Sequence, residues 1–256
     1  MALSQTSRLV LFRVGSLAKA LVYILMGLFC LGTVVGMVSS TGGPQETIKW
    51  LGQNPFGQAL YFLLGVGLGA YALWRAYKVI FDPQDDGFMG RLTSLSVTIA
   101  YGGLAFYAFA RLFGKASDDD VREDLLQIVL GLPYGVIIVY LIALGVIAAG
   151  ISALYIGIKN RHVKDIPDWN LHPWQAALFS NVGRVGLLGV AIVYFIMAYS
   201  LFRVAYYRTG EAFKGVGASL AYLETGQIGW WLMVITGVGL LAYGIFMVLR
   251  AAYEKV

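Results

Sequence analysis

Long apolar runs dominate the chain, and short polar segments separate them. Six runs stand out, at 14–38, 56–77, 92–110, 134–158, 183–202 and 228–249. About 20 residues, each rising about 1.5 Å, cross a hydrocarbon core that is roughly 30 Å thick. Lipid tolerates only helices or closed barrels, and the runs lack the period-two alternation of barrel strands. The pattern therefore predicts an all-α, polytopic membrane protein with six transmembrane helices.

The six runs form three similar pairs. In the first run of each pair, an arginine precedes a tyrosine by ten residues, giving Arg13 and Tyr23, Arg91 and Tyr101, and Arg184 and Tyr194. In the second run, a motif with a glycine in its first position begins at Gly67, Gly145 and Gly239. Recurrence of one register in two separate runs is the signature of an internal repeat.

We therefore expect a single membrane domain over residues 1–256, built from three tandem two-helix repeats. Repeat one covers 8–80, repeat two 86–160 and repeat three 178–256. A two-helix unit returns the chain to the side from which it started, so all three copies have the same orientation. Parallel copies predict an approximate pseudo-threefold arrangement around an axis along the membrane normal.

Short amphipathic helices are expected between the two runs of each repeat. Pro44 in repeat one marks a typical helix entry, and a serine and acidic residues at 117–124 suit the capped first turn of a helix in repeat two. Apolar residues then follow at helical spacing. They are Ile48 and Leu51 in repeat one; Val121, Leu125, Ile128, Val129 and Leu132 in repeat two; and Phe213, Val216, Leu220 and Leu223 in repeat three. Such helices are expected to lie on the outer membrane surface.

Charge predicts the orientation of the chain. Hydrophobic residues make up 59% of the sequence and charged residues 13%, about half the charged share of a soluble domain. With six spans, 12 of the 19 lysines and arginines lie on the side of the two termini. Because basic residues favour the cytoplasmic side, we expect a multi-pass protein of the inner (plasma) membrane with both termini cytoplasmic. The chain has no soluble basic domain, which argues against a nucleic-acid partner.

Lys19 is the only charged residue well inside an apolar run. An intramembrane charge is a functional hypothesis in its own right. The alternative is that the side chain snorkels to the interface, because Lys19 follows Arg13 by only six residues.

The recurring arginines and tyrosines are further candidates for a ligand or lipid site. Tyr23, Tyr101 and Tyr194 could form a layer that faces the axis, either as packing with bonded hydroxyls or as part of a site. Arg13, Arg91 and Arg184 either anchor the span ends at lipid headgroups or form an inward basic ring that holds an anion.

Several local patterns resemble a known bacterial family. They include Arg13-Val14-Gly15 and Leu21-Val22-Tyr23 in the first run, and Gln53-Asn54-Pro55-Phe56-Gly57 and Trp74-Arg75 around the second. These repeats resemble integral membrane proteins of the domain of unknown function 1206 (DUF1206). The resemblance implies three two-helix copies over nearly the whole chain, and it implies no activity. Repeat two departs from the pattern, with Thr93 at the position of Gly15 and Ala149 at that of Tyr71.

Motifs for enzymatic chemistry are not found. The sequence has no Ser-His-Asp pattern, phosphate-binding loop or Cys-x-x-Cys, and the acidic residues at 118–124 fit no metal-binding spacing. We therefore expect no cofactor and no metal. The leading interpretation is a non-enzymatic scaffold that binds membrane lipids, a membrane-protein partner or a second copy of the chain. The alternative is a small transporter or channel with a site on the pseudo-threefold axis. An intramembrane enzyme is the least favoured hypothesis, because no nucleophile–base pair is visible in the sequence.

Overall fold

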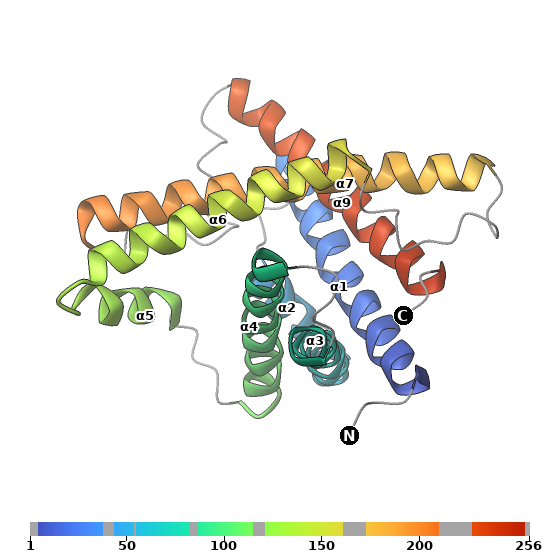
Figure 1. Cartoon of the computed structure of the whole chain (residues 1–256), viewed down its shortest axis with the longest axis horizontal. Coiled ribbons are helices and arrows are strands. Elements are labelled where there is room, and N and C mark those ends of the chain that lie inside the picture. The colour runs from blue at the N-terminus through green and yellow to red at the C-terminus, as the bar shows by residue number, and fades with distance from the viewer. Residues whose placement is uncertain are drawn as a thin grey trace.

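The described part of the protein is entirely helical apart from turns (Figure 1). The computed structural model describes residues 5–37, 44–53, 55–81, 87–114, 121–160, 173–209 and 227–253. The long helices are α1 (Gln5–Val34), α3 (Gly57–Phe81), α4 (Gly87–Leu112), α6 (Gly135–Ile158), α7 (Pro173–Tyr207) and α9 (Gln227–Tyr253). Two short helices, α2 (Pro44–Gly52) and α5 (Val121–Leu130), connect the arms of repeats one and two. The predicted all-α fold is confirmed.

Among the described residues, 5 helices are long and apolar enough to cross a membrane. They are α1, α3, α6, α7 and α9. The remaining long helix, α4, has 26 residues, and the stretch of it searched among the described residues, Val97–Leu112, is apolar but shorter than a full span. The membrane class is thus established, and the sixth span stays a prediction.

The two short helices confirm two of the three expected linker helices. In α2, Ile48 and Leu51 are buried, as the amphipathic pattern predicts. In α5, Val129 packs against the α6–α7 pair, whereas Ile128 is 65% exposed. The face of α5 that packs is therefore rotated from the predicted one. The third linker helix lies in 210–226, and part of the acidic segment lies in 115–120, both outside the described residues.

The helices pack in the order α4, α3, α1, α9, α7, α6. The first and last helices of the chain, α1 and α9, run side by side through the middle of the molecule (Figure 1). In a closed ring of three repeats, α4 and α6 would also pack against each other. Among the described residues these two helices make no comparable contact. In Figure 1, α3 is seen down its axis while α6 and α7 lie lengthwise, so the helices do not share one direction.

Glycines permit close contact between the two arms of repeats one and three. A Cβ atom added at Gly15 would lie 2.6 Å from Tyr71 Cβ, and one added at Gly186 would lie 2.6 Å from Tyr243 Cα. Gly186 occupies in repeat three the position that Gly15 occupies in repeat one. Small residues of this kind let helices approach closely in lipid.

Repeat two lacks the residues for this approach. Thr93 replaces the glycine at the position of Gly15, and Ala149 replaces the tyrosine at that of Tyr71. A Cβ atom added at Gly145 would meet nothing within 4 Å. The repeat is therefore complete in sequence, but its two arms are not held together in the way the other copies are. The predicted pseudo-threefold arrangement is not confirmed.

Alanine substitution at one repeat position tests this difference. Added methyl groups at Gly67 and Gly239 would meet Ala18 Cβ and Gly189 Cα respectively, so we expect each variant to lose about 1–3 kcal/mol of stability. At Gly145 we expect no loss, or a gain of about 0.5–1 kcal/mol, because alanine is the better helix former. Thermal unfolding in detergent checks all three variants. An equal loss at Gly145 would show that α4 and α6 do pack closely.

A buried lysine in a tyrosine cage as the candidate functional site

Lys19 lies inside the protein and does not reach the membrane surface. Its side chain is 6% exposed. The ammonium nitrogen Nζ donates hydrogen bonds to Tyr243 Oη at 3.0 Å and to Tyr71 Oη at 3.4 Å. These acceptors belong to α9 and α3, on either side of α1. The snorkelling interpretation of Lys19 is therefore wrong, because the ammonium is held between the helices.

Four tyrosine rings surround the ammonium. Nζ lies 4.9 Å from the ring centroid of Tyr71, 5.0 Å from that of Tyr101, 5.1 Å from that of Tyr243 and 5.7 Å from that of Tyr23. We call these four residues the tyrosine cage. A cation within about 6 Å of an aromatic face is attracted to it, and the attraction is strongest where water is excluded.

The members of the cage also support one another. The Tyr23 and Tyr243 rings pack edge to face at 4.8 Å, as do those of Tyr71 and Tyr101 at 5.0 Å. The hydroxyl oxygens of Tyr23 and Tyr101 lie 3.2 Å apart, within hydrogen-bond distance. Tyr194 packs against the same core. The cage thus fixes four helices, α1, α3, α4 and α9, at one place.

Two arginines extend the site beside the cage. Arg75 donates from Nε and Nη2 to Tyr71 Oη, each at 3.4 Å, and its guanidinium lies 5.1 Å from the Trp74 ring centroid. The guanidinium of Arg250 lies 5.6 Å from the Phe12 ring centroid, and Phe12 in turn packs on Trp74 at 4.9 Å. Basic and aromatic side chains therefore alternate at the end of the α1–α9 pair where Phe12 and Arg250 lie.

Acidic groups are missing from the long helices. None of the 14 aspartates and glutamates falls within the bounds of α1, α3, α4, α6, α7 or α9. Among the described residues there is also no cluster of His, Cys, Asp or Glu that could hold a metal ion. The site is rich in cations and hydroxyls, so its chemistry suits holding helices together or attracting an anion.

The seven sequence candidates differ in where the structure places them, and Tyr194 packs against the core beside the cage. Lys19, Tyr23 and Tyr101 come together in the site, as described above. Arg13 is exposed, and Arg184 is exposed and donates from Nε to Asn160 Oδ1 at 2.6 Å. Arg91 belongs to α4, but its side chain lies outside those described.

Sequence reasoning missed the second-arm residues of the site, Tyr71, Tyr243 and Arg75. A signal for two of them was present, because Tyr71 and Tyr243 occupy the same repeat position. The close approach at Gly15 is what brings Tyr71 to Lys19.

A chain that repeats an apolar two-helix unit three times, with helices long enough to cross a bilayer, is an integral membrane repeat protein. It belongs to the family described as Domain of Unknown Function (DUF1206), whose model matches residues 14–82, 94–160 and 185–254. The predicted family and its three-repeat layout are thereby confirmed.

One similar protein is the uncharacterized protein YxxB of Bacillus subtilis (strain 168). The two chains are 24% identical over 249 residues, which cover 94% of this chain and 90% of the relative. No solved structure matches the chain.

Removing the hydroxyl acceptors tests the cage. Tyr243→Phe removes the acceptor of the shorter Lys19 hydrogen bond, and we expect a loss of about 1.5–3 kcal/mol, the usual range for a bond to a charged group. Tyr71→Phe should cost at least as much, because Tyr71 Oη also accepts from Arg75. Thermal unfolding in detergent is the measurement. Tyr134→Phe, at a position that is 72% exposed, is the matched control. Equal melting temperatures for all of these variants would contradict the role of the cage.

Proposed function

We propose that the protein is a non-enzymatic scaffold of the inner (plasma) membrane, with both termini cytoplasmic, that binds anionic phospholipids. The observation that carries the proposal is the enclosed cation. The Lys19 ammonium already has two hydroxyl acceptors and four aromatic faces, so its contacts are those of a group that fixes helices in place.

Close packing around the cage supports a binding role over a conducting one. The α1–α9 contact is tight, since a Cβ atom added at Gly27 would lie 2.8 Å from the Gly237 carbonyl oxygen. The contact between α1 and α3 at Gly15 is equally close. A solute path through these helices would require the cage and its backbone contacts to separate.

Charge supports anionic lipid as the ligand. Basic residues exceed acidic ones by five over the chain, and most lie toward the side predicted to be cytoplasmic. Lysine and arginine near a membrane surface attract anionic headgroups by about 1 kcal/mol each. Arg75 and Arg250 lie beside the cage, toward the carboxyl ends of α3 and α9.

One observation favours the alternative of a small transporter or channel. Charged residues inside membrane helices commonly mark the route of an ion or substrate, and Lys19 is such a residue. In that function the cage would open during each transport cycle.

Lipid retention tests the proposed function. We expect the purified full chain to carry phospholipid in native mass spectrometry, and phosphatidylglycerol to be retained in preference to phosphatidylcholine, because the first is anionic. The same preference should appear as a larger rise in melting temperature with phosphatidylglycerol. A chain that retains neither lipid, or both equally, would contradict the proposal.

Reconstituted vesicles separate the scaffold from the transporter. We expect vesicles that contain the protein to release trapped small ions no faster than protein-free vesicles, because the cage stays closed. Release above that background, and its loss in Lys19→Met, would favour the transporter.

A further inference from the structure

The Lys19 ammonium has one more hydrogen-bond donor than the cage has acceptors for it. An ammonium group carries three N–H donors. Lys19 Nζ donates to Tyr243 Oη at 3.0 Å and to Tyr71 Oη at 3.4 Å. Among the described residues it has no third acceptor, and its other contacts are with the faces of the tyrosine rings. One N–H of a buried cation is therefore without a hydrogen bond.

The two tyrosines that accept from Lys19 add further donors. Tyr243 Oη receives one N–H group, and Tyr71 Oη receives three, from Lys19 and from Nε and Nη2 of Arg75. Each neutral phenol also carries an O–H proton, which a lysine or an arginine cannot accept. In the described part of the chain, neither hydroxyl donates to an acceptor. Two O–H donors thus join the unused N–H of Lys19.

Ser16 is a fourth donor without an acceptor. Its side chain is 0% exposed, and its Oγ has no hydrogen-bond partner among the residues described. Ser16 precedes Lys19 by three residues, so the two side chains lie on one face of α1. The next polar residue of that face, Tyr23, is different, because its hydroxyl lies 3.2 Å from that of Tyr101 and the two can bond to each other.

This excess of donors defines the chemistry of the missing group. A water molecule would accept hydrogen bonds but would bring two O–H donors of its own, so it would not relieve the excess. An anion only accepts. It would also supply the negative charge that a buried ammonium needs and that no residue of the long helices provides. Helices α1 and α3 are in close contact at Gly15, next to Ser16, so the anion has to be small.

We propose that the core of the protein binds one small monovalent anion of the halide class at these donors. The site consists of Ser16, Lys19, Tyr71 and Tyr243. Lys19 supplies the charge, and the three hydroxyls supply directed donors from α1, α3 and α9. The bound ion is a fixed part of the closed cage. The site goes beyond the proposed lipid binding and does not depend on it.

Bromide is the probe for this site. We expect the full chain in detergent and gluconate buffer to bind one bromide per chain in isothermal titration calorimetry. The melting temperature should be higher in sodium bromide than in sodium gluconate at equal ionic strength, because an ion that binds only the folded chain stabilises it. No binding of bromide and equal melting temperatures in the two salts would overturn the site.

Ser16→Ala removes one donor without adding bulk. We expect bromide to bind about tenfold more weakly, because a hydrogen bond to a charged group is lost. In gluconate the variant should melt at the same temperature as the original chain or higher, because a buried hydroxyl without an acceptor is gone. Unchanged affinity for bromide, or a lower melting temperature in gluconate, would overturn the part assigned to Ser16 and with it the site.

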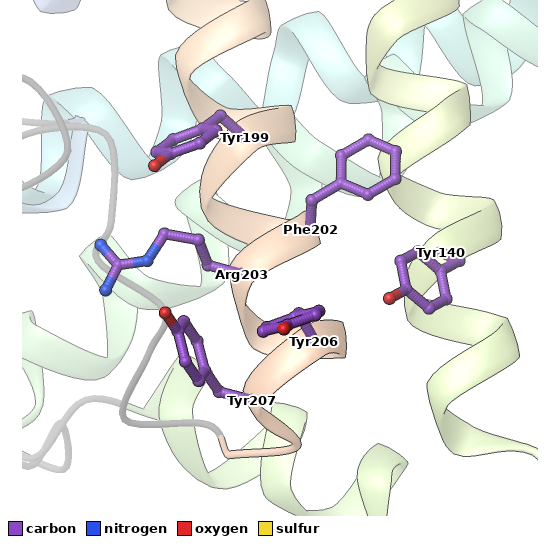
Figure 2. A pocket seen from close by; sticks show the side chains of 6 residues that line it. All are labelled: Tyr140, Tyr199, Phe202, Arg203, Tyr206 and Tyr207. Carbon is purple, nitrogen blue, oxygen red and sulfur yellow. The ribbon is translucent and has the colours of Figure 1, made fainter.

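A tyrosine outside the cage provides the matched control for Tyr243→Phe, which should also weaken bromide binding. Figure 2 shows Tyr207 and Arg203 on the same side of α7. The Arg203 guanidinium lies 5.7 Å from the Tyr207 ring centroid, and Tyr207 is 58% exposed. Tyr207→Phe therefore removes a hydroxyl that lies near a cation at an open position. We expect it to leave the affinity for bromide unchanged, and an effect equal to that of Tyr243→Phe would overturn the site.

A tyrosinate at Tyr71 would be the other source of negative charge. Near-UV absorption distinguishes the two, because tyrosinate absorbs at longer wavelength than neutral tyrosine. We expect the original chain to show no tyrosinate band at neutral pH in either salt. A band that is present in the original chain and absent in Tyr71→Phe would overturn the anion site and assign the charge to Tyr71.

Discussion

An ammonium group among membrane helices needs a compensating environment at the place where it is buried. Removing a charge from water costs several kcal/mol, and a carboxylate partner is the usual remedy. The long helices of this protein contain no carboxylate, so tyrosines take that role with their ring faces and hydroxyl oxygens. Because no single helix can supply four rings around one nitrogen, α1, α3, α4 and α9 have to meet at Lys19. The core of the protein is organised by this requirement.

Glycine placement makes the meeting possible. Because Gly15 has no side chain, Tyr71 of α3 can pack directly against the backbone of α1. The equivalent pair in repeat three is Gly186 and Tyr243. Repeat three thus supplies Tyr243, from its second arm, as a hydrogen-bond acceptor for Lys19 of repeat one across the α1–α9 contact. Repeat two contributes Tyr101 from its first arm only, since Ala149 stands at the second-arm position. The three copies share one sequence repeat, but each contributes different residues to the surroundings of the Lys19 ammonium.

Sequence reasoning predicted the helices and repeats well, because apolar length and residue spacing are local properties. It also selected Lys19, Tyr23 and Tyr101, since a charge inside a span and a recurring tyrosine are visible along one arm. It missed Tyr71 and Tyr243 because their part depends on which helices touch. Thr93 and Ala149 were recognised as departures from the repeat, but their effect on the contact between α4 and α6 required three-dimensional packing. The arginines at the start of each first arm were conspicuous in sequence, and those described here lie at the surface.

The pairing of α1 with α9 has a consequence for biosynthesis. Helix α1 is synthesised well before α9, because Tyr243 follows Lys19 by 224 residues. Until then the Lys19 ammonium lacks its closest acceptor. The nascent chain must therefore keep α1 near water, near headgroups or beside the insertion machinery until α9 can dock. The cage around Lys19 is complete only when α9 has packed against α1.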